Sequence, residues 1–220
     1  MNDIYPFLHD KSSYKFTKSY FSHLGRVSPY RFATPNPLTS EHLEIVGQRA
    51  ANIIFDKITS SSVSIIAIAS RGIPLGTATL FHLASYKNME CFLSHTSCQG
   101  SLEHAYLESN TKYTVLMDNA INSGKTIINV IDKLKRHQIV PDLIIRLFDR
   151  QEFDKFGGNT TTFEKLVGCP IASIFYLSDL IGSLERDEER SEIIQYALNY
   201  GTNEIKEYIH KNFTYNCNRL

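Results

Sequence analysis

Short runs of mostly apolar, β-branched residues recur along this chain, and segments with helical spacing separate them. A strand that is apolar on both faces must be covered on both sides, as the strands of a parallel sheet are. Strands that alternate with helices therefore predict an α/β fold, with a central, mostly parallel sheet flanked by helices. The four runs are Val63–Ala69, Tyr113–Asp118, Leu143–Phe148 and Ile171–Tyr176.

Helical spacing and capping residues predict the elements between these strands. A helix should begin after Thr39 or Ser40, either of which can cap its first turn, and Pro74 can start another. We expect the polar segment between Cys91 and Cys98 to be a loop. The predicted buried faces are Leu43, Val46, Ala50 and Ile53 in the first helix, and Ile127, Ile128, Ile131 and Leu134 in the helix after the second strand.

Length and composition restrict the classes of protein that this chain can belong to. The chain has 220 residues, 42% of them hydrophobic, which is enough to bury one substantial core. Lys+Arg and Asp+Glu number 23 each, and there is no dense basic run, so we expect no nucleic-acid partner. No apolar stretch has the length of a signal peptide or a membrane span, and no C-x-x-C pair occurs. A cytoplasmic protein with free thiols is the expectation.

The chain is expected to form one compact unit with three parts. Residues 1–38 are aromatic-rich and interrupted by prolines, so we expect an irregular N-terminal segment there. Residues 39–185 contain the alternating strands and helices and are the predicted core. Residues 186–220 are predicted to be a helical tail, whose charged run from 185 to 192 is most simply a solvated helix face.

Parallel sheets bind ligands beyond the carboxyl ends of their strands, which directs attention to the residues that follow each strand. The segment Val115–Thr126 is an apolar strand that ends in an acid and an amide, followed by a short loop with a glycine and the start of a helix. Loop amides and hydroxyls at a helix N-terminus suit a phosphate monoester. It is not a P-loop, because Asn119 stands where the first glycine of that motif belongs. An ordinary strand–turn–helix junction is the alternative.

Several segments together resemble the orotate phosphoribosyltransferase family. The loop Asp118–Thr126 is similar to the phosphoribosyl-diphosphate motif of type I phosphoribosyltransferases. The other matching segments, in the family's order and spacing between about residues 21 and 185, are Gly25–Phe32, Arg71–Leu75, Asp149–Glu152 and Leu177–Ile181. The resemblance implies the type I phosphoribosyltransferase fold, with the N-terminal segment as a small hood on the base side.

The resemblance also implies an activity and its partners. Members of this family transfer ribose 5-phosphate from phosphoribosyl diphosphate to orotate, forming orotidine 5-phosphate and pyrophosphate in pyrimidine biosynthesis. They use Mg²⁺, which the substrate holds rather than the protein directly, and they are homodimers whose active sites are completed across a two-fold. A glycosyltransferase of the pentosyl class is therefore expected.

Carried over residue by residue, the resemblance assigns a role to each part of the site. Asp118 and Asn119 would hold the ribose hydroxyls at the reacting centre. The 5-phosphate would be bound by Asn122, Ser123, Gly124, Lys125 and Thr126, the pyrophosphate by Arg71 and Gly72, and the base by Arg150, Phe32 and His23. A surface ion pair is the alternative for Arg150, and simple core packing is the alternative for Phe32.

Departures from the family's pattern leave two functions open. Asn119 replaces the family's second acid, and the segment that corresponds to its mobile catalytic loop, residues 94–110, contains no Lys or Arg. That loop carries His95 and His104 beside Glu103 and Glu108, and an acidic loop would repel pyrophosphate. The first function is an active orotate phosphoribosyltransferase, and the second is a degenerate relative that binds a phosphoribosyl ligand or nucleotide as a sensor or partner protein. A purine-type transferase is a weaker third.

Overall fold

The computed structural model describes residues 5–22, 25–58, 60–97, 113–119, 125–153 and 158–213. Its centre is a five-stranded sheet in which every pair of neighbouring strands is parallel, in the order β4-β3-β5-β6-β7. The α/β class is confirmed, and the four predicted strands agree with the observed ones to within one residue at either end. The strands are β3 (Ser62–Ile68), β4 (Glu90–Thr96), β5 (Thr114–Asp118), β6 (Leu143–Asp149) and β7 (Ile171–Tyr176).

The edge strand β4 was not predicted, and the expectation of a loop in this segment was wrong. Residues Glu90–Thr96 pair along their whole length with β3. Because β4 ends the sheet, it has a single neighbouring strand, and Glu90 and His95 on it are exposed. A strand at such an edge is only half covered, so it tolerates polar side chains that a central strand excludes.

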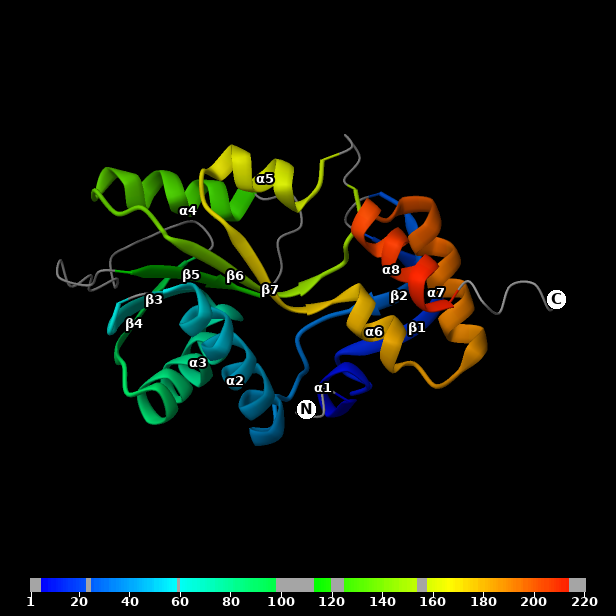
Figure 1. The fold of residues 1–220 in the computed structure, drawn as a ribbon, viewed down its shortest axis with the longest axis horizontal. Helices are drawn as coiled ribbons and strands as arrows, with labels where there is room; N and C mark the ends of the chain where they lie inside the picture. The colour runs from blue at the N-terminus through cyan, green and yellow to red at the C-terminus, as the bar shows by residue number, and fades with distance from the viewer. Residues whose placement is uncertain are drawn as a thin grey trace.

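Helices cover both faces of the sheet (Figure 1). Helices α2 (Ser40–Lys57) and α3 (Gly72–Lys87) lie on one face, and α4 (Lys125–Arg136) and α5 (Thr160–Val167) lie on the other. Each face has its own apolar cluster, one containing α2 and α3 residues and the other containing α4 residues. The central strands alternate their side chains between these clusters, which explains why they are apolar throughout.

Helix α2 begins where the sequence predicted, but its buried face is rotated slightly. The Thr39 hydroxyl accepts a hydrogen bond from the His42 backbone at 3.2 Å, and the His42 ring accepts one from the Thr39 backbone at 3.3 Å, which forms a capping box. Leu43 and Ile53, predicted to be buried, are only half-buried. The buried residues are His42, Ile45, Val46, Gly47, Ala50, Ala51 and Ile54.

On α4 the prediction was closer. Ile127, Ile131 and Leu134 are buried as expected, whereas Ile128 is half-buried and Val130 takes its place in the core. The offset on both helices has one cause, because the neighbouring element decides which side of a broad apolar stripe is covered.

A second layer of structure, the hood, lies at one end of the sheet (Figure 1). Strands β1 (Tyr14–Phe21) and β2 (Val27–Phe32) form an antiparallel hairpin within the segment where the sequence predicted only irregular structure. Four helices lie at the same end of the sheet as this hairpin, so the hood, as the term is used from here on, also includes parts of the chain beyond the N-terminal segment. They are α1 (Tyr5–Leu8), α6 (Leu177–Ser183), α7 (Asp187–Tyr200) and α8 (Asn203–Phe213). The prediction of helices after Leu177 is confirmed. Helix α7 packs against β2, and residues 185–188 are exposed, as expected for a solvated helix face.

Two stacked aromatic pairs attach the hood to the sheet. Phe7 of α1 stacks on Phe175 of β7 with ring centroids 4.6 Å apart. Phe32 of β2 stacks on Phe148 of β6 with centroids 3.9 Å apart. Both partners lie near the carboxyl ends of their strands, so the hood covers the edge of the sheet where ligands of α/β proteins bind.

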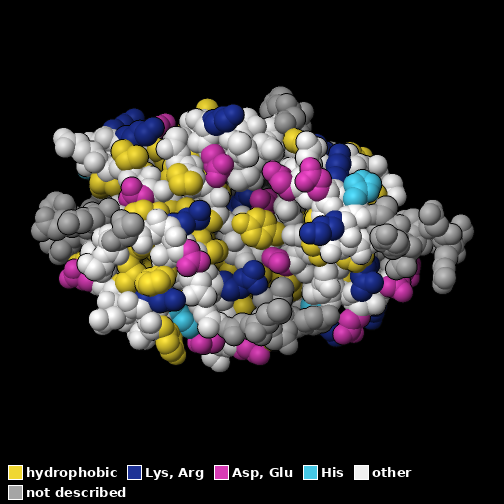
Figure 2. All heavy atoms as spheres, viewed as in Figure 1, with side chains coloured by type: hydrophobic (Ala, Val, Ile, Leu, Met, Phe, Trp, Pro, Cys, Tyr) yellow, Lys and Arg dark blue, Asp and Glu magenta, His cyan; other side chains and the backbone are white. Residues whose placement is uncertain are grey.

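The surface shows no sign of a large single-charge area on the face seen in Figure 2, where Lys and Arg side chains alternate with Asp and Glu. None of the helices within the described ranges combines the length and apolarity required to cross a lipid bilayer.

The contact between α2 and α3 generates a prediction about stability. A Cβ atom added to Gly47 would lie 2.6 Å from the His82 ring and 2.7 Å from the Ala78 carbonyl oxygen, so the two helices would have to separate. Gly47→Ala is therefore expected to lower the free energy of unfolding by about 1–3 kcal/mol despite alanine's higher helix propensity. Urea unfolding followed by circular dichroism measures it. The control, Asn52→Ala on the exposed side of α2, should be neutral or stabilising, and equal stability of both variants would contradict the prediction.

Candidate functional site

Five of the site residues predicted from the sequence lie at or just after the ends of three neighbouring strands. Arg71 and Gly72 come after β3, Asp118 and Asn119 end β5, and Arg150 follows β6. Because β3, β5 and β6 are adjacent and parallel, these residues meet at one edge of the sheet. The described part of this predicted site is therefore brought together, with β5 in the middle.

Asp118 is the buried acid of this edge. It is 8% exposed, and burial raises its pKa to about 6, although a hydrogen bond of 2.7 Å from the Asn119 amide to its Oδ1 acts in the opposite direction. Removal from water disfavours the charged form of a carboxyl group, which explains the shift. At neutral pH the group is mostly ionised but close enough to its pKa to respond to a nearby cation or hydroxyl.

Asn119 connects the strand end to the hood. Its side-chain amide donates to the Thr34 hydroxyl at 3.3 Å, and its backbone carbonyl accepts from the Leu147 amide at 3.2 Å. Thr34 follows the hood strand β2 and was not selected from the sequence. The amide that replaces the expected second acid thus has a structural partner, and its side-chain carbonyl can still accept a hydrogen bond from a ligand.

The turn between β3 and α3 has the features of an anion site. Gly72 begins α3, and a Cβ atom there would lie 2.6 Å from the Met117 carbonyl oxygen, so only glycine lets this turn approach β5. Arg71 immediately precedes the helix, its side chain is exposed, and it makes no hydrogen bond or ion pair with the residues that the structure describes. The peptide bond between Ala69 and Ser70 is cis. A cation beside the positive end of a helix dipole favours a negatively charged ligand.

The second predicted anion site lies partly outside the described residues. Helix α4 begins at Lys125, whose side chain is exposed, and Thr126 follows in its first turn. Asn122, Ser123 and Gly124 of the proposed phosphate loop fall outside the described residues, and so does His23. Their roles stay predictions.

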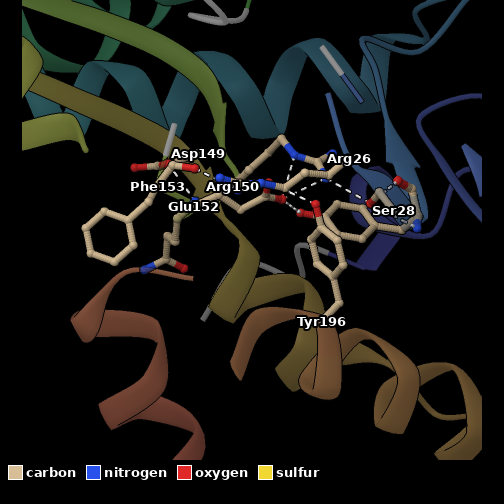
Figure 3. A network of polar contacts seen from close by, with 9 residues as sticks. Arg26, Ser28, Asp149, Arg150, Glu152, Phe153 and Tyr196 are labelled. Carbon is tan, nitrogen blue, oxygen red and sulfur yellow. Dashed lines mark hydrogen bonds and ion pairs between the residues drawn. The ribbon is translucent and has the colours of Figure 1, made fainter. Parts of the chain in front are cut away.

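Arg150 takes part in a buried polar network (Figure 3). Its Nε donates to Glu152 Oε1 at 2.8 Å, its Nη2 lies 2.7 Å from the same oxygen, and Nη2 also donates to the Ser28 hydroxyl at 2.9 Å. Its guanidinium lies over the Tyr30 ring, 4.3 Å from the centroid. Burial alone would lower the pKa of Arg150, but the adjacent Tyr30 and Glu152 raise it above its ordinary value, so the group stays charged.

Glu152 is the centre of that network. Its side chain is 1% exposed, and it accepts hydrogen bonds from the Tyr30 hydroxyl at 3.3 Å and the Tyr196 hydroxyl at 3.1 Å. Arg26 lies 3.9 Å from its second oxygen. The pairing of Arg150 with Glu152 is therefore an ion pair of the interior, not the surface ion pair that was the alternative reading of Arg150.

The two remaining side chains of this corner have structural partners. One face of the Phe32 ring is covered by Phe148, as the core-packing alternative required, and contact of Phe32 with a base stays a prediction. Asp149 accepts from the Gln151 amide at 2.8 Å and the Thr160 hydroxyl at 3.1 Å, and it pairs with the buried Arg146. Asp149 therefore shapes the turn in which Gln151 adopts a φ of 50°.

Sequence reasoning missed Tyr196 altogether. This residue lies on α7 within a stretch of helix whose inward positions are apolar, including Ile193 and Ala197. By its spacing alone a tyrosine there reads as an ordinary core residue. Nothing in the local sequence connects it with Glu152, 44 residues earlier.

Comparison with known proteins adds independent findings. A scan against protein-family models gives no match. The chain is 29% identical over 193 residues to the orotate phosphoribosyltransferase of Proteus mirabilis, covering 81% of this chain and 87% of that protein. It is 30% identical over 179 residues to the orotate phosphoribosyltransferase of Ruthia magnifica subsp. Calyptogena magnifica, covering 77% and 82%.

Solved structures share the fold. The orotate phosphoribosyltransferase from Francisella tularensis superimposes with a TM-score of 0.72 at 21% identity, covering 89% of this chain and 96% of that one. UMP synthase of Leishmania donovani gives a TM-score of 0.65 at 15% identity, with 87% of this chain matching 40% of that protein.

The raised pKa of Asp118 predicts how its removal changes stability with pH. The folded pKa of about 6 exceeds the ordinary aspartate value of 3.8, so ionisation of this group opposes folding, and the cost grows as pH rises from about 4 to 6. Asp118→Asn is expected to be more stable than the parent by roughly 3 kcal/mol at pH 8, with the difference vanishing below about pH 3. Thermal unfolding at a series of pH values measures it. A difference that is constant with pH would contradict the assigned cause.

Proposed function

This chain belongs to the orotate phosphoribosyltransferase family of pentosyltransferases, and on that premise we propose that it transfers ribose 5-phosphate from phosphoribosyl diphosphate to orotate. The products are orotidine 5-phosphate and pyrophosphate, a step of pyrimidine biosynthesis. The observation that carries the proposal is the meeting of a buried acid, an exposed arginine at a helix N-terminus and a half-buried arginine paired with Glu152 at one sheet edge.

The order of the strands supports this assignment of roles. A ribose held at Asp118 would lie at the end of β5, between the ends of β3 and β6. Arg71 and the N-terminus of α3 would then face the pyrophosphate on one side, and Arg150 would face the base on the other. Leaving group and attacking base thus lie on opposite sides of the ribosyl carbon, as displacement at that carbon requires.

The chemistry asks the protein mainly to hold charges in place. The bond between the ribosyl carbon and the pyrophosphate oxygen breaks, and the pyrophosphate leaves with the electron pair. A ring nitrogen of orotate bonds to the same carbon and loses its proton to solvent or to the departing pyrophosphate. Arg71 and the first-turn amides of α3 would stabilise the negative charge that builds up on the leaving oxygen. Lys125 and Thr126 at the start of α4 would bind the 5-phosphate.

The donor set fits a magnesium ion that arrives with the substrate. Mg²⁺ in phosphate-transfer sites is held by one or two carboxylates together with phosphate oxygens and water. Asp118, at the end of β5, would contribute one carboxylate, and the described residues contain no cluster of three or more acidic, histidine or cysteine side chains that could hold a metal ion by itself. A bound Mg²⁺ would neutralise part of the charge on the departing pyrophosphate.

The departures from the family's sequence pattern affect the expected rate of the reaction more than the assignment of the chain to the family. Residues 94–110 supply no Lys or Arg, and only residues 94–97 of this segment lie in the described ranges. We therefore expect turnover to be slow. The relatives found are named as enzymes, so the alternative of a sensor without turnover gains no support from them.

A homodimer is part of the proposal. It rests on the resemblance to the family, in which the active sites are completed across a two-fold. Helices α2 and α3 also expose three aromatic side chains, Phe55, Phe81 and Tyr86, at 46%, 62% and 73%. Association with a second chain over these helices would remove that apolar surface from water.

Loss of orotate absorbance in the presence of phosphoribosyl diphosphate and Mg²⁺ tests the proposed reaction. We expect measurable turnover, and Asp118→Ala should lower kcat/KM by at least about 100-fold because the ribose loses its anchoring carboxylate. Asp132→Ala, which removes an exposed acid from α4, should leave it unchanged. Absent turnover together with calorimetric binding of ribose 5-phosphate would favour the sensor alternative, and turnover with a purine but not orotate would favour a purine transferase.

Asn119 provides a second prediction. A carboxylate at this position accepts stronger hydrogen bonds from ribose hydroxyls than an amide does. Asn119→Asp is therefore expected to raise kcat by roughly tenfold, the change that about 1.4 kcal/mol produces. Steady-state kinetics measure it, with Asn52→Asp on the exposed side of α2 as the control for added charge. A lower kcat would mean instead that the bond from Asn119 to Thr34 matters more than the charge.

A further inference from the structure

Three separate parts of the chain meet around Arg150, the arginine that is proposed to bind the base. Arg150 and Glu152 follow β6, Ser28 and Tyr30 lie on β2 of the hood, and Tyr196 comes from α7 (Figure 3). Contacts among them form a continuous set, from the Tyr196 hydroxyl through Glu152 to the Arg150 guanidinium. Helix α7 therefore reaches the base side of the site, although it lies far from the other site residues in sequence.

These contacts restrict how Arg150 can point. Glu152 Oε1 contacts both Nε and Nη2 of Arg150, and the Ser28 hydroxyl accepts a hydrogen bond from Nη2 as well. The edge of the guanidinium formed by Nε and Nη2 is therefore occupied. The Tyr30 ring lies 4.3 Å from the guanidinium carbon and covers one of its faces. None of the described residues accepts a hydrogen bond from Nη1. A guanidinium is rigid and planar, so occupying one edge fixes the direction of the remaining donors.

Tyr196 touches both supports of Arg150. Its hydroxyl donates to Glu152 Oε2 at 3.1 Å, and its ring meets the Tyr30 ring edge-on with centroids 6.2 Å apart. The residue is 5% exposed. Burial, and then the neighbouring Glu152, raise the pKa of Tyr196, so the hydroxyl keeps its proton and acts as the donor.

We propose that Tyr196 is a positioning residue for base recognition, which fixes Arg150 by holding Glu152 with its hydroxyl and Tyr30 with its ring. The inference rests on the proposed function, in which Arg150 binds the base. It makes α7 part of the orotate side of the site, whereas no described residue of α3 or α4, which carry the proposed pyrophosphate and 5-phosphate sides, takes part in this network.

Loss of the Tyr196 hydroxyl is expected to weaken the binding of one substrate and not of the other. Without it, Arg26 at 3.9 Å, beyond hydrogen-bond length, would be the remaining partner of Glu152 Oε2 among the residues that the structure describes. A buried carboxylate oxygen that lacks a donor draws neighbouring donors toward itself. The pair of Glu152 and Arg150 would then shift from the geometry that suits the base. Binding of orotate should weaken, whereas binding of phosphoribosyl diphosphate should not.

Steady-state kinetics of Tyr196→Phe test the inference. We expect KM for orotate to rise by roughly five- to tenfold, less than the direct loss of a hydrogen bond to a charged ligand group would give, because the lost bond acts on Arg150 only through Glu152. KM for phosphoribosyl diphosphate and kcat at saturating orotate should change less than about twofold. The matched control is Tyr14→Phe, which loses a hydroxyl bond of 3.2 Å to Glu189 on the same helix but touches neither Glu152 nor Arg150. Its constants should equal those of the parent.

A second variant separates positioning from folding. Glu152→Gln keeps the shape of the side chain but removes the charge that holds Arg150, and it should raise KM for orotate more than Tyr196→Phe does. Melting temperatures of all variants are measured in parallel.

The outcomes distinguish this inference from the proposed function on which it rests. If the parent protein turns over and Tyr196→Phe behaves like Tyr14→Phe, or raises both KM values equally, Tyr196 has no positioning role and the proposed function stands. If the parent shows neither turnover nor calorimetric binding of orotidine 5-phosphate, the proposed function is overturned and this inference with it.

Discussion

Coverage of the parallel sheet on both faces is the constraint from which the rest of the structure follows. The strands β3, β5 and β6 are almost entirely buried between α2 and α3 on one face and α4 and α5 on the other. A layer of this kind favours the strand ends for charged side chains, because a charged group within a strand, such as Arg146, has to be paired there. Acid, amide and arginine groups therefore gather at the carboxyl edge.

The hood completes that edge. It is attached by two kinds of contact, the stacked pairs Phe7–Phe175 and Phe32–Phe148 and the network centred on Glu152. The aromatic pairs are apolar and tolerate small shifts, whereas a buried carboxylate requires specific donors from each element around it. The network thus sets the relative orientation of the hood hairpin, the β6 turn and α7. Under the proposed function, docking of the hood would therefore also fix the arginine that binds the base.

The charged groups at the proposed site are two exposed cations and one buried acid, which a phosphorylated ligand would contact. Arg71 and Lys125 are exposed cations at the N-termini of α3 and α4, where the helix dipoles add to their attraction for phosphate groups. Asp118 is buried, with a pKa raised to about 6, and its ionisation opposes folding. A site of this kind is less stable empty than a neutral one would be, and the interactions with ligand offset that cost.

The sequence by itself determined the class of fold, the extent of the four central strands, the start of α2 after Thr39 or Ser40 and the strand ends to which the site is assigned. Each depends on residues close in the chain, such as the apolar run that ends at Asp118. The resemblance of short motifs then pointed to the family and to Arg71, Asp118 and Arg150.

Tertiary structure alone decided the rest. Residues 90–96 became an edge strand because β3 offered them a partner, although their polar pattern had suggested a loop. Glu152 became a buried centre because Tyr30 and Tyr196 approach it from positions 122 residues earlier and 44 residues later. Pairing of this kind depends on how whole elements pack, and no local spacing in the sequence records it, which is why the sequence could show neither the ion pair of Arg150 with Glu152 nor the contact of Tyr196 with that carboxylate.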